Sequence, residues 1–202
     1  MDETKIREPQ QKRAIEKKNK IILAGLSLFS KKGYHNTNTV EIAKLAGVST
    51  GALYSYFKDK KAIYIEAFDY FLNEHAVPIL DKVAQLPSQT DLTVFVEKIV
   101  DAFLVLYKDT SNAMLELTNT MSIDEDISRY FCDYESWYFL KFAEVFKKHG
   151  IYHDDILERI YLAYTLLDLL GLEQTNYHHK FIRFEVLKAE VVSTITNLLT
   201  AE

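Results

Sequence analysis

The chain of 202 residues has only one cysteine, three prolines and six glycines. The single cysteine, Cys132, excludes an internal disulfide and is typical of a protein in a reducing compartment. With so few breaker residues and no sustained alternation of apolar and polar positions, the sequence gives no sign of a β-sheet. No signal peptide is recognisable, and no apolar run approaches the roughly 18 residues that would cross a bilayer. These absences predict an all-α, cytoplasmic protein that has no membrane partner.

The usual motifs of catalysis and metal binding are also missing. We find no Gly-rich phosphate loop, no Gly-x-Ser-x-Gly nucleophile turn, no His-Glu-x-x-His and no cysteine pair. His178 and His179 are the one adjacent pair that resembles metal ligands, but no third ligand follows at a suitable spacing. We therefore expect no catalytic residues, no metal and no cofactor, and do not expect an enzyme.

The charge of the chain is unevenly distributed. Residues 1–61 hold 13 Lys and Arg against 6 Asp and Glu, a balance of +7, whereas residues 62–202 hold 11 against 23, a balance of −12. The overall charge of −5 conceals this difference. The N-terminal part is therefore predicted to meet a polyanion such as DNA. Hydrophobic residues make up 48% of the chain, which is enough for a packed core.

Two short helices joined by a tight turn are predicted between residues 37 and 61. Asn38 and Glu41 have the spacing of a capping box and predict a helix over 39–46. Ser49 follows a Gly-Val pair and is the expected N-cap of a second helix over 50–57. These proportions are those of a helix-turn-helix, in which the second helix enters the DNA major groove.

The outer face of the second helix has the chemistry of a phosphate-binding surface. Tyr54 and Tyr56 supply phenolic hydroxyls, and Lys58, Lys60 and Lys61 follow directly. Hydroxyl and ammonium groups in this arrangement are typical of contacts to the DNA backbone. A Gly-containing turn between short helices also occurs as plain scaffold in all-α proteins, and the tyrosines and lysines favour DNA binding over that alternative.

The segment 25–68 resembles the DNA-binding domain of the TetR (tetracycline-repressor) family of bacterial transcription regulators. The matching pieces include Lys32-Gly33-Tyr34, Ile42-Ala43, Ala46-Gly47-Val48-Ser49 and Tyr56-Phe57. Gly25 departs from the small helix-forming residue, usually Ala, of that family. The resemblance implies a homodimer with an N-terminal three-helix reading head and a variable C-terminal helical domain for ligand binding and dimerisation. Its partners would be a double-stranded DNA operator, a second copy of the chain and a small ligand.

The resemblance also assigns DNA contacts to individual residues. It implies that Thr37 contacts a phosphate near the start of the first short helix and that Lys60 contacts a phosphate just beyond the second. The contacts that it assigns to the second short helix, the recognition helix, are Thr50, Gly51, Ala52, Tyr54, Ser55 and Tyr56. Gly51 has a physical reason as well, because the lack of a side chain lets the DNA approach the backbone closely.

The chain is expected to divide into three parts and about nine helices. The parts are a flexible basic arm over 1–14, the helix-turn-helix domain over 15–61, and the ligand-binding and dimerisation domain over 62–202. Besides the two short helices, we expect helices over 15–32, 60–83 with a kink or break at Pro78, 92–108, 112–121, 124–149, 155–174 and 180–199.

Aromatic residues in the second part favour a small-molecule pocket, since Tyr and Trp combine a broad apolar face with a polar group. The candidate lining residues, each of which core packing would also explain, are Phe103, Tyr107, Tyr134, Trp137, Tyr138, Tyr161 and Tyr164. Four acidic residues stand within apolar stretches: Glu116, Glu135, Asp168 and Glu173. If two of them face the cavity, a cationic ligand is favoured through charge and cation–π attraction; otherwise an aromatic or lipophilic ligand fits equally well.

The function that follows is a transcriptional regulator, a repressor released from a palindromic operator by its ligand. The alternative is a ligand-binding or protein-interaction module that keeps the helix-turn-helix as scaffold.

Overall fold

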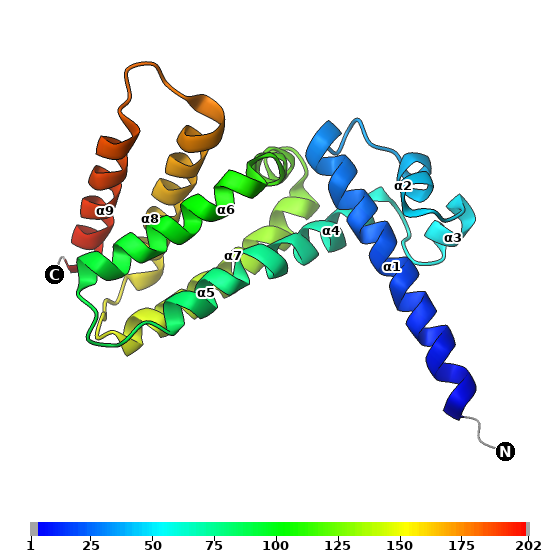
Figure 1. Cartoon of the computed structure of the whole chain (residues 1–202), viewed down its shortest axis with the longest axis horizontal. Coiled ribbons are helices and arrows are strands. Elements are labelled where there is room, and N and C mark those ends of the chain that lie inside the picture. The colour runs from blue at the N-terminus through cyan, green and yellow to red at the C-terminus, as the bar shows by residue number, and fades with distance from the viewer. Residues whose placement is uncertain (1–3, 201–202) are drawn as a thin grey trace. The chain divides into compact units, whose positions relative to one another are not determined.

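In the computed structural model the backbone of residues 4–200 is described, with side chains from residue 12 onward, and all regular elements in this range are helical (Figure 1). The elements are α1 (Thr4–Lys32), α2 (Thr39–Ala46), α3 (Thr50–Tyr54), α4 (Lys60–His75), α5 (Val77–Ala84), α6 (Leu92–Met121), α7 (Glu125–Lys148), α8 (Ile156–Leu172), the π-helical turn η1 (Glu173–Tyr177) and α9 (Phe184–Thr200). The predicted all-α class is confirmed. Within the described range, no helix has the length and apolar character needed to cross a membrane.

The chain divides into two compact units. Unit 1 comprises Met1–Leu72 and Leu115–Ser128, and unit 2 comprises Asn73–Met114 and Arg129–Glu202. The helices α6 and α7 each contribute to both units, because the corner between them belongs to unit 1. A division at residue 61 missed this corner, whose sequence carries no motif that would link it to the helix-turn-helix.

The helix α1 begins earlier than the sequence suggested. Its first residue is Thr4, within the segment 1–14 that is expected to be a flexible basic arm, and residues 1–3 lie outside the described part. The physical reason is the composition of residues 10–20, which are almost all Gln, Lys, Arg, Glu, Ala or Ile. Gln, Lys, Arg and Glu have unbranched side chains that lose little rotamer freedom in a helix, and Ala is the strongest helix former.

Other boundaries were partly right. The break near Pro78 is confirmed, since α4 ends at His75 and Pro78 stands in the first turn of α5, where its missing N–H costs nothing. The expected helices over 92–108 and 112–121 are one helix, α6, because Thr110 satisfies its hydroxyl within it by donating to the Leu106 carbonyl. The end of the second short helix was placed too late, since α3 ends at Tyr54.

Aromatic rings form the core of unit 1. The Tyr64 ring lies 5.0 Å from that of Phe29, 5.0 Å from that of Tyr34 and 4.5 Å from that of Phe68. Gly25 now has a packing reason, because a Cβ there would come within 2.8 Å of Ile63 Cγ2. The glycine that weakens α1 as a helix therefore lets α1 and α4 pack closely.

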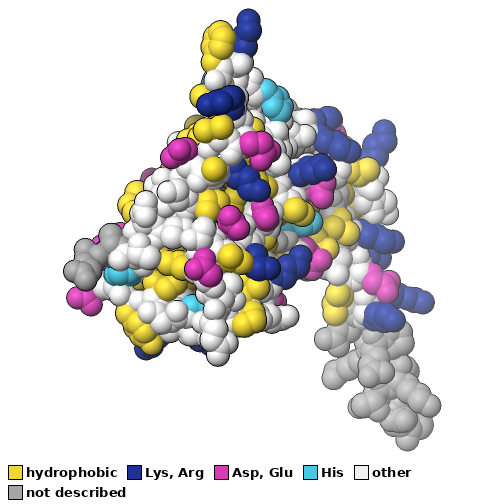
Figure 2. Space-filling view, turned by 60° about the vertical axis from the view of Figure 1, so that its left-hand side comes forward, with side chains coloured by type: hydrophobic (Ala, Val, Ile, Leu, Met, Phe, Trp, Pro, Cys, Tyr) yellow, Lys and Arg dark blue, Asp and Glu magenta, His cyan; other side chains and the backbone are white. Residues whose placement is uncertain are grey.

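Unit 2 is built from α5, α8 and α9 with most of α6 and α7. In Figure 1, α8 and α9 run side by side and antiparallel. Phe95 and Phe146 meet at 5.8 Å between ring centres, and Phe142 lies 6.0 Å from Phe146. Hydrophobic side chains also remain at the surface in view in Figure 2. The exposed ones on α8, η1, α9 and the loop before α9 are Leu157, Tyr161, Leu162, Leu169, Tyr177, Phe181, Ile182 and Val186.

Candidate DNA-binding surface and ligand cavity

The turn between α2 and α3 is fixed by side chains that cap the backbone. Asn38 accepts the Glu41 N–H at 3.0 Å, and Ser49 accepts the Ala52 N–H at 3.1 Å, which confirms both predicted N-caps. Gly47 ends α2 in the left-handed conformation, with φ of 69°. The capping box is only half formed, since the Glu41 carboxylate accepts from Lys32 at 3.0 Å instead of returning to Asn38.

The outer face of α3 has few constraints from the rest of the chain. Gly51, Tyr54 and Ser55 are exposed, whereas Leu53 and Phe57 are buried against the rest of unit 1. The remaining predicted contacts on this segment, Thr50, Ala52 and Tyr56, are half-buried.

Gly51 is free of intrachain crowding. A Cβ built there would meet no atom within 4 Å, and the residue belongs to a regular helix. Neither packing nor backbone conformation within this chain therefore requires glycine at this position.

One recognition-helix tyrosine is oriented by α2. The Tyr54 hydroxyl lies 2.9 Å from Thr39 Oγ1, and either group can donate. Half of the surface of Tyr54 is exposed. Thr39 was not among the predicted site residues, and no sequence signal would have paired it with a residue 15 positions away.

Two predicted phosphate contacts are engaged with the loop between α1 and α2. Thr37 is buried, and its hydroxyl donates to the Gly33 carbonyl at 2.9 Å. The Lys60 ammonium donates to the carbonyls of Tyr34 at 2.7 Å and Thr37 at 2.9 Å, and partial burial lowers its pKa. An ammonium has three donors, so one remains for a phosphate, and direct contact by either residue stays a prediction.

The C-terminal part of α6 contacts the same loop between α1 and α2. Glu116 Oε1 accepts the Tyr34 N–H at 2.6 Å and the Thr120 hydroxyl at 3.0 Å, and Tyr64 donates to the Glu116 carbonyl at 3.3 Å. Gly33, with φ of 83°, would bring a Cβ to 3.3 Å from this carboxylate. Glu116, one of four acidic candidates for the ligand cavity, therefore belongs to unit 1 and holds the loop.

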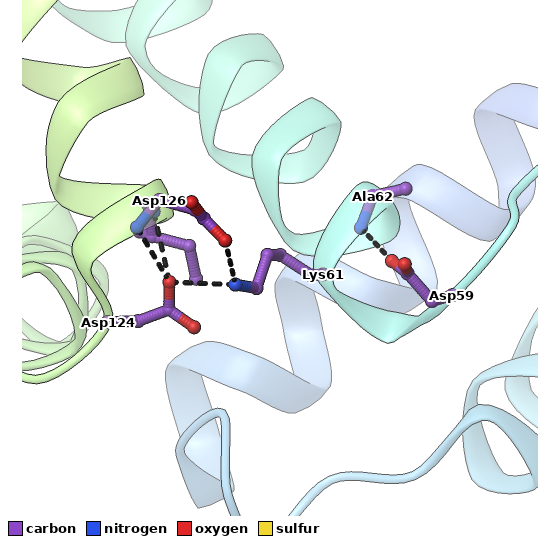
Figure 3. A network of polar contacts seen from close by, with 6 residues as sticks. Asp59, Lys61, Ala62, Asp124 and Asp126 are labelled. Carbon is purple, nitrogen blue, oxygen red and sulfur yellow. Dashed lines mark hydrogen bonds and ion pairs between the residues drawn. The ribbon is translucent and has the colours of Figure 1, made fainter.

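A second ionic contact joins the start of α7 to the start of α4. Lys61 points between Asp124 and Asp126, at 2.9 and 2.8 Å (Figure 3). These hydrogen bonds raise the pKa of Lys61. Asp124 also accepts the Ile127 N–H at 3.1 Å and so caps α7, while Asp59 accepts the Ala62 N–H and caps α4. The lysine expected to face DNA is thus committed to the α6–α7 corner.

Unit 2 contains a narrow apolar cavity between α6, α7, α8 and α9. Its volume is only about 30 Å³. Three of the seven predicted residues line the cavity: Phe103, Tyr138 and Tyr164. The lining residues that were not predicted are Ile99, Phe139, Phe142, Phe146, Ile160, Ala163, Leu167 and Ile195. The three phenylalanines of α7 in this set were read as general aromatic content, because their helix is aromatic on more than one face.

The other four predicted residues lie outside the lining. Trp137 is exposed and packs 5.7 Å from Tyr134, while Tyr161 is exposed and packs 6.1 Å from the cavity residue Phe139. Tyr107 is buried one layer away, with its hydroxyl donating to Asp168. Its ring lies directly over Gly171, where a Cβ would meet it at 2.3 Å.

Two of the four acidic candidates come together in unit 2. Asp168 accepts from Tyr107, and Glu135 accepts from Tyr164 at 3.5 Å. Burial, and then the charge of Asp168, raise the pKa of Glu135 to about 7; burial raises the pKa of Asp168 to about 6, against the opposing hydrogen bond from Tyr107.

The fourth acidic residue has a different role. Glu173 in η1 accepts the His179 N–H at 2.7 Å and pairs with the His179 ring at 2.5 Å, which lowers the pKa of Glu173. These contacts close the loop after α8, where His178 has a left-handed φ of 50°. Among the described residues no group of three potential ligands could hold a metal.

Comparison with known proteins matches unit 1 to a defined family. Residues 21–67 match the model of bacterial regulatory proteins of the tetR family. A stretch of 57 residues, 28% of this chain and 20% of the relative, is 44% identical to the uncharacterized HTH-type regulator YerO of Bacillus subtilis. A stretch of 71 residues, 35% of this chain and 34% of the relative, is 41% identical to the HTH-type regulator RutR of Escherichia coli. The matched stretch thus spans at most about a third of the length of either relative.

Solved structures share the fold along nearly the whole chain. A TetR-family regulator from Mesorhizobium loti matches with a TM-score of 0.74 at 18% identity, over 93% of this chain and 96% of that one. A regulator from Saccharomonospora viridis in complex with choline gives 0.67 at 19%, over 88% and 94%. The fatty acid degradation regulator FadR from Bacillus halodurans gives 0.67 at 22%, over 92% and 95%. Residues 21–67 thus match the tetR family of bacterial regulatory proteins, and the whole chain shares the fold of solved TetR-family regulators.

Proposed function

We propose that this protein is a DNA-binding transcriptional regulator, most simply a repressor that leaves a palindromic operator when a small ligand occupies unit 2. The observation that carries the proposal is Gly51. Its position on the exposed face of α3 has open space around it, so glycine there suits the approach of an external surface rather than internal packing. A major groove that receives α3 supplies such a surface.

The unpaired hydrophobic surface of α8 supports a homodimer, which a palindromic operator requires. Tyr161, Leu162 and Leu169 each expose at least half of their surface, on a helix whose opposite face packs into unit 2. We expect Leu169→Lys to shift the protein from dimer to monomer in light scattering, whereas Leu140→Lys, at an exposed leucine of α7, leaves the dimer intact. An unchanged dimer in the Leu169→Lys variant would place the interface elsewhere.

A ligand can release the protein from DNA if it binds more tightly to the conformation that does not fit the operator than to the one that does. Two heads that read successive major grooves must lie about 34 Å apart, and a ligand that prefers another spacing weakens DNA binding. A coupling of about 1 to 3 kcal/mol per site gives a 5- to 150-fold loss of operator affinity. The helices α6 and α7 suit this task, since each contributes residues to the cavity or its surroundings and residues to unit 1.

The test is a fluorescence-anisotropy titration of promoter fragments, including the gene's own upstream region, at two salt concentrations. Sequence-selective binding with steep salt dependence is expected. Gly51→Leu should weaken this binding at least about a hundredfold, equivalent to about 2.7 kcal/mol, without loss of thermal stability. A matched variant, Asn112→Leu at an exposed position of α6, should bind DNA normally.

The alternative, an interaction module that keeps the helix-turn-helix as scaffold, predicts a different result. In that case Gly51→Leu has no effect on whatever weak, sequence-indifferent DNA binding remains. Lys60→Ala is a poorer test of the two functions, because the Lys60 ammonium also holds the α1–α2 loop and its loss would disturb that loop.

A further inference from the structure

Two carboxylates of unit 2, Glu135 and Asp168, lie behind the apolar lining of the cavity and are not part of that lining. Glu135 on α7 is linked to it through Tyr164, whose hydroxyl donates to Glu135 and whose ring lines the cavity. Asp168 follows one helical turn after Tyr164 on α8 and accepts from Tyr107. The charge of Asp168 acts on Glu135, so the two groups share one environment.

Neither carboxylate has a cationic partner in this unit. No lysine or arginine of the described chain forms an ion pair with Glu135 or Asp168, and each accepts only from a tyrosine. Other acidic residues of unit 2 do find a cation. Asp101 pairs with Lys188 at 2.6 Å, Glu144 with Lys141 at 3.0 Å and Asp155 with Arg159 at 2.7 Å.

The uncompensated charge is costly where it lies. Desolvation is the first cause that raises the pKa of both groups, and mutual repulsion adds to it for Glu135. Two partly buried carboxylates can be relieved either by protons or by a cation that enters from outside. An anionic ligand would increase the repulsion, and a neutral one would leave it unchanged.

The cavity beside them suits the rest of such a ligand. The Phe103 and Phe139 rings lie 6.3 and 5.3 Å from that of Tyr164, both in edge-on arrangements. Aromatic faces attract a cation through the ring quadrupole and also cover an apolar body. The lining residues are apolar or aromatic, so Glu135, reached through Tyr164, and its neighbour Asp168 are the charges that a bound cation would approach.

We propose that this cavity binds an organic monocation, an amine or quaternary ammonium with an apolar or aromatic body, whose charge lies against Glu135 and Asp168 and whose body packs among Phe103, Phe139 and Tyr164. The proposal rests on the regulator function above and names the ligand class of its cavity. Because the aromatic rings leave only a narrow space, entry of the body requires them to move apart.

Isothermal titration calorimetry on the full-length protein at about pH 8, where carboxylates are ionised, tests this without DNA. The probes are tetramethylammonium, phenyltrimethylammonium and tert-butylbenzene, the neutral isostere of the second, with decanoate as the anion. Phenyltrimethylammonium should bind at least about tenfold more tightly than tert-butylbenzene, a difference of about 1.4 kcal/mol, and decanoate should bind more weakly still.

Variants locate the charge that the cation meets. Glu135→Gln and Asp168→Asn keep the shape of each side chain, and each should weaken phenyltrimethylammonium by about tenfold while sparing tert-butylbenzene. Glu144→Gln and Asp101→Asn, which remove paired surface carboxylates on α7 and α6, should change neither.

Several outcomes would overturn the proposal. These are equal binding of cation and isostere, tighter binding of decanoate, no binding of either cation up to about 10 mM, or cation binding that the double variant Glu135→Gln, Asp168→Asn leaves unchanged. Failure of the regulator function is a separate result, seen as absent operator binding in anisotropy. A cation that binds in calorimetry without changing operator affinity would support the site and refute its role as inducer.

Discussion

The two units use polar side chains in opposite ways. In unit 1 the polar groups close on partners: Asn38 and Ser49 cap helices, Lys60 holds two loop carbonyls, and Glu116 accepts the Tyr34 N–H. In unit 2 the central acidic pair has only tyrosine hydroxyls for partners. The polar groups of unit 1 named here are paired within the chain, whereas the acidic pair of unit 2 lacks a cationic partner among the described residues.

The largest effect is expected from packing at Gly171. Gly171→Ala would place a Cβ 2.3 Å from the Tyr107 ring, so the ring must shift and its contact with Asp168 is lost. Overpacking of this kind costs about 3 kcal/mol, measurable by urea denaturation. The same change at Gly51, where the space is open, should be neutral or stabilise by up to about 1 kcal/mol. Equal effects at both sites would contradict the close contact.

The next effect concerns the carboxylate that holds the α1–α2 loop. Glu116→Ala leaves the part-buried Tyr34 N–H without its acceptor and should destabilise the protein by about 2 kcal/mol. Glu116→Gln keeps an acceptor oxygen and should cost less than half as much. Asp109→Ala, at an exposed position on the same helix, is the control. If Glu116→Ala costs no more than this control, unit 1 does not depend on the α6–α7 corner in the way described.

A third prediction is that one substitution, Glu135→Gln, stabilises the folded protein, whereas most substitutions destabilise it. Burial raises the pKa of Glu135 to about 7, so the folded chain holds this proton more tightly than the unfolded chain does. Stability is therefore lost as the pH rises from about 4 through 7. Glu135→Gln should raise the melting temperature by about 2–6 °C at pH 8 and by little at pH 5. A lower melting temperature at pH 8 would mean that the carboxylate is already compensated.

The smallest effect is expected at the recognition helix. Thr39→Val keeps the side-chain shape but removes the hydroxyl beside Tyr54, and should weaken operator binding about fivefold, or about 1 kcal/mol, with stability unchanged. In a double-mutant cycle with Tyr54→Phe the two losses should be less than additive. Fully additive losses would show that Thr39 does not orient the tyrosine.

Local signals in the sequence predicted most of unit 1. The caps at Asn38 and Ser49 and the turn at Gly47 depend on neighbours within a few residues, and each is confirmed; the break near Pro78, in unit 2, is a local signal of the same kind. Contacts over long separations were missed, such as Glu116 with Tyr34 across 82 positions. Residue type alone also could not show that Lys61 is bound by two aspartates rather than presented to DNA.

For unit 2, the sequence predicted an aromatic cavity but not which residues line it. Aromatic content indicated a cavity, yet helical spacing could not separate lining from core, because α7 is aromatic around more than one face. Three of the seven candidate residues line the cavity. The pairing of Glu135 with Asp168 required the packing of α7 against α8, which no local pattern in the sequence records.

The sparse surroundings of α3 carry a consequence for how such a protein diverges. The exposed positions Gly51 and Ser55 make no side-chain contact beyond their own helix, and Tyr54 is tied only through Thr39. Substitutions there leave the core residues Leu53 and Phe57 untouched. Changes of side chain at these positions can therefore alter what the exposed face of α3 would bind while the packing of unit 1 stays the same.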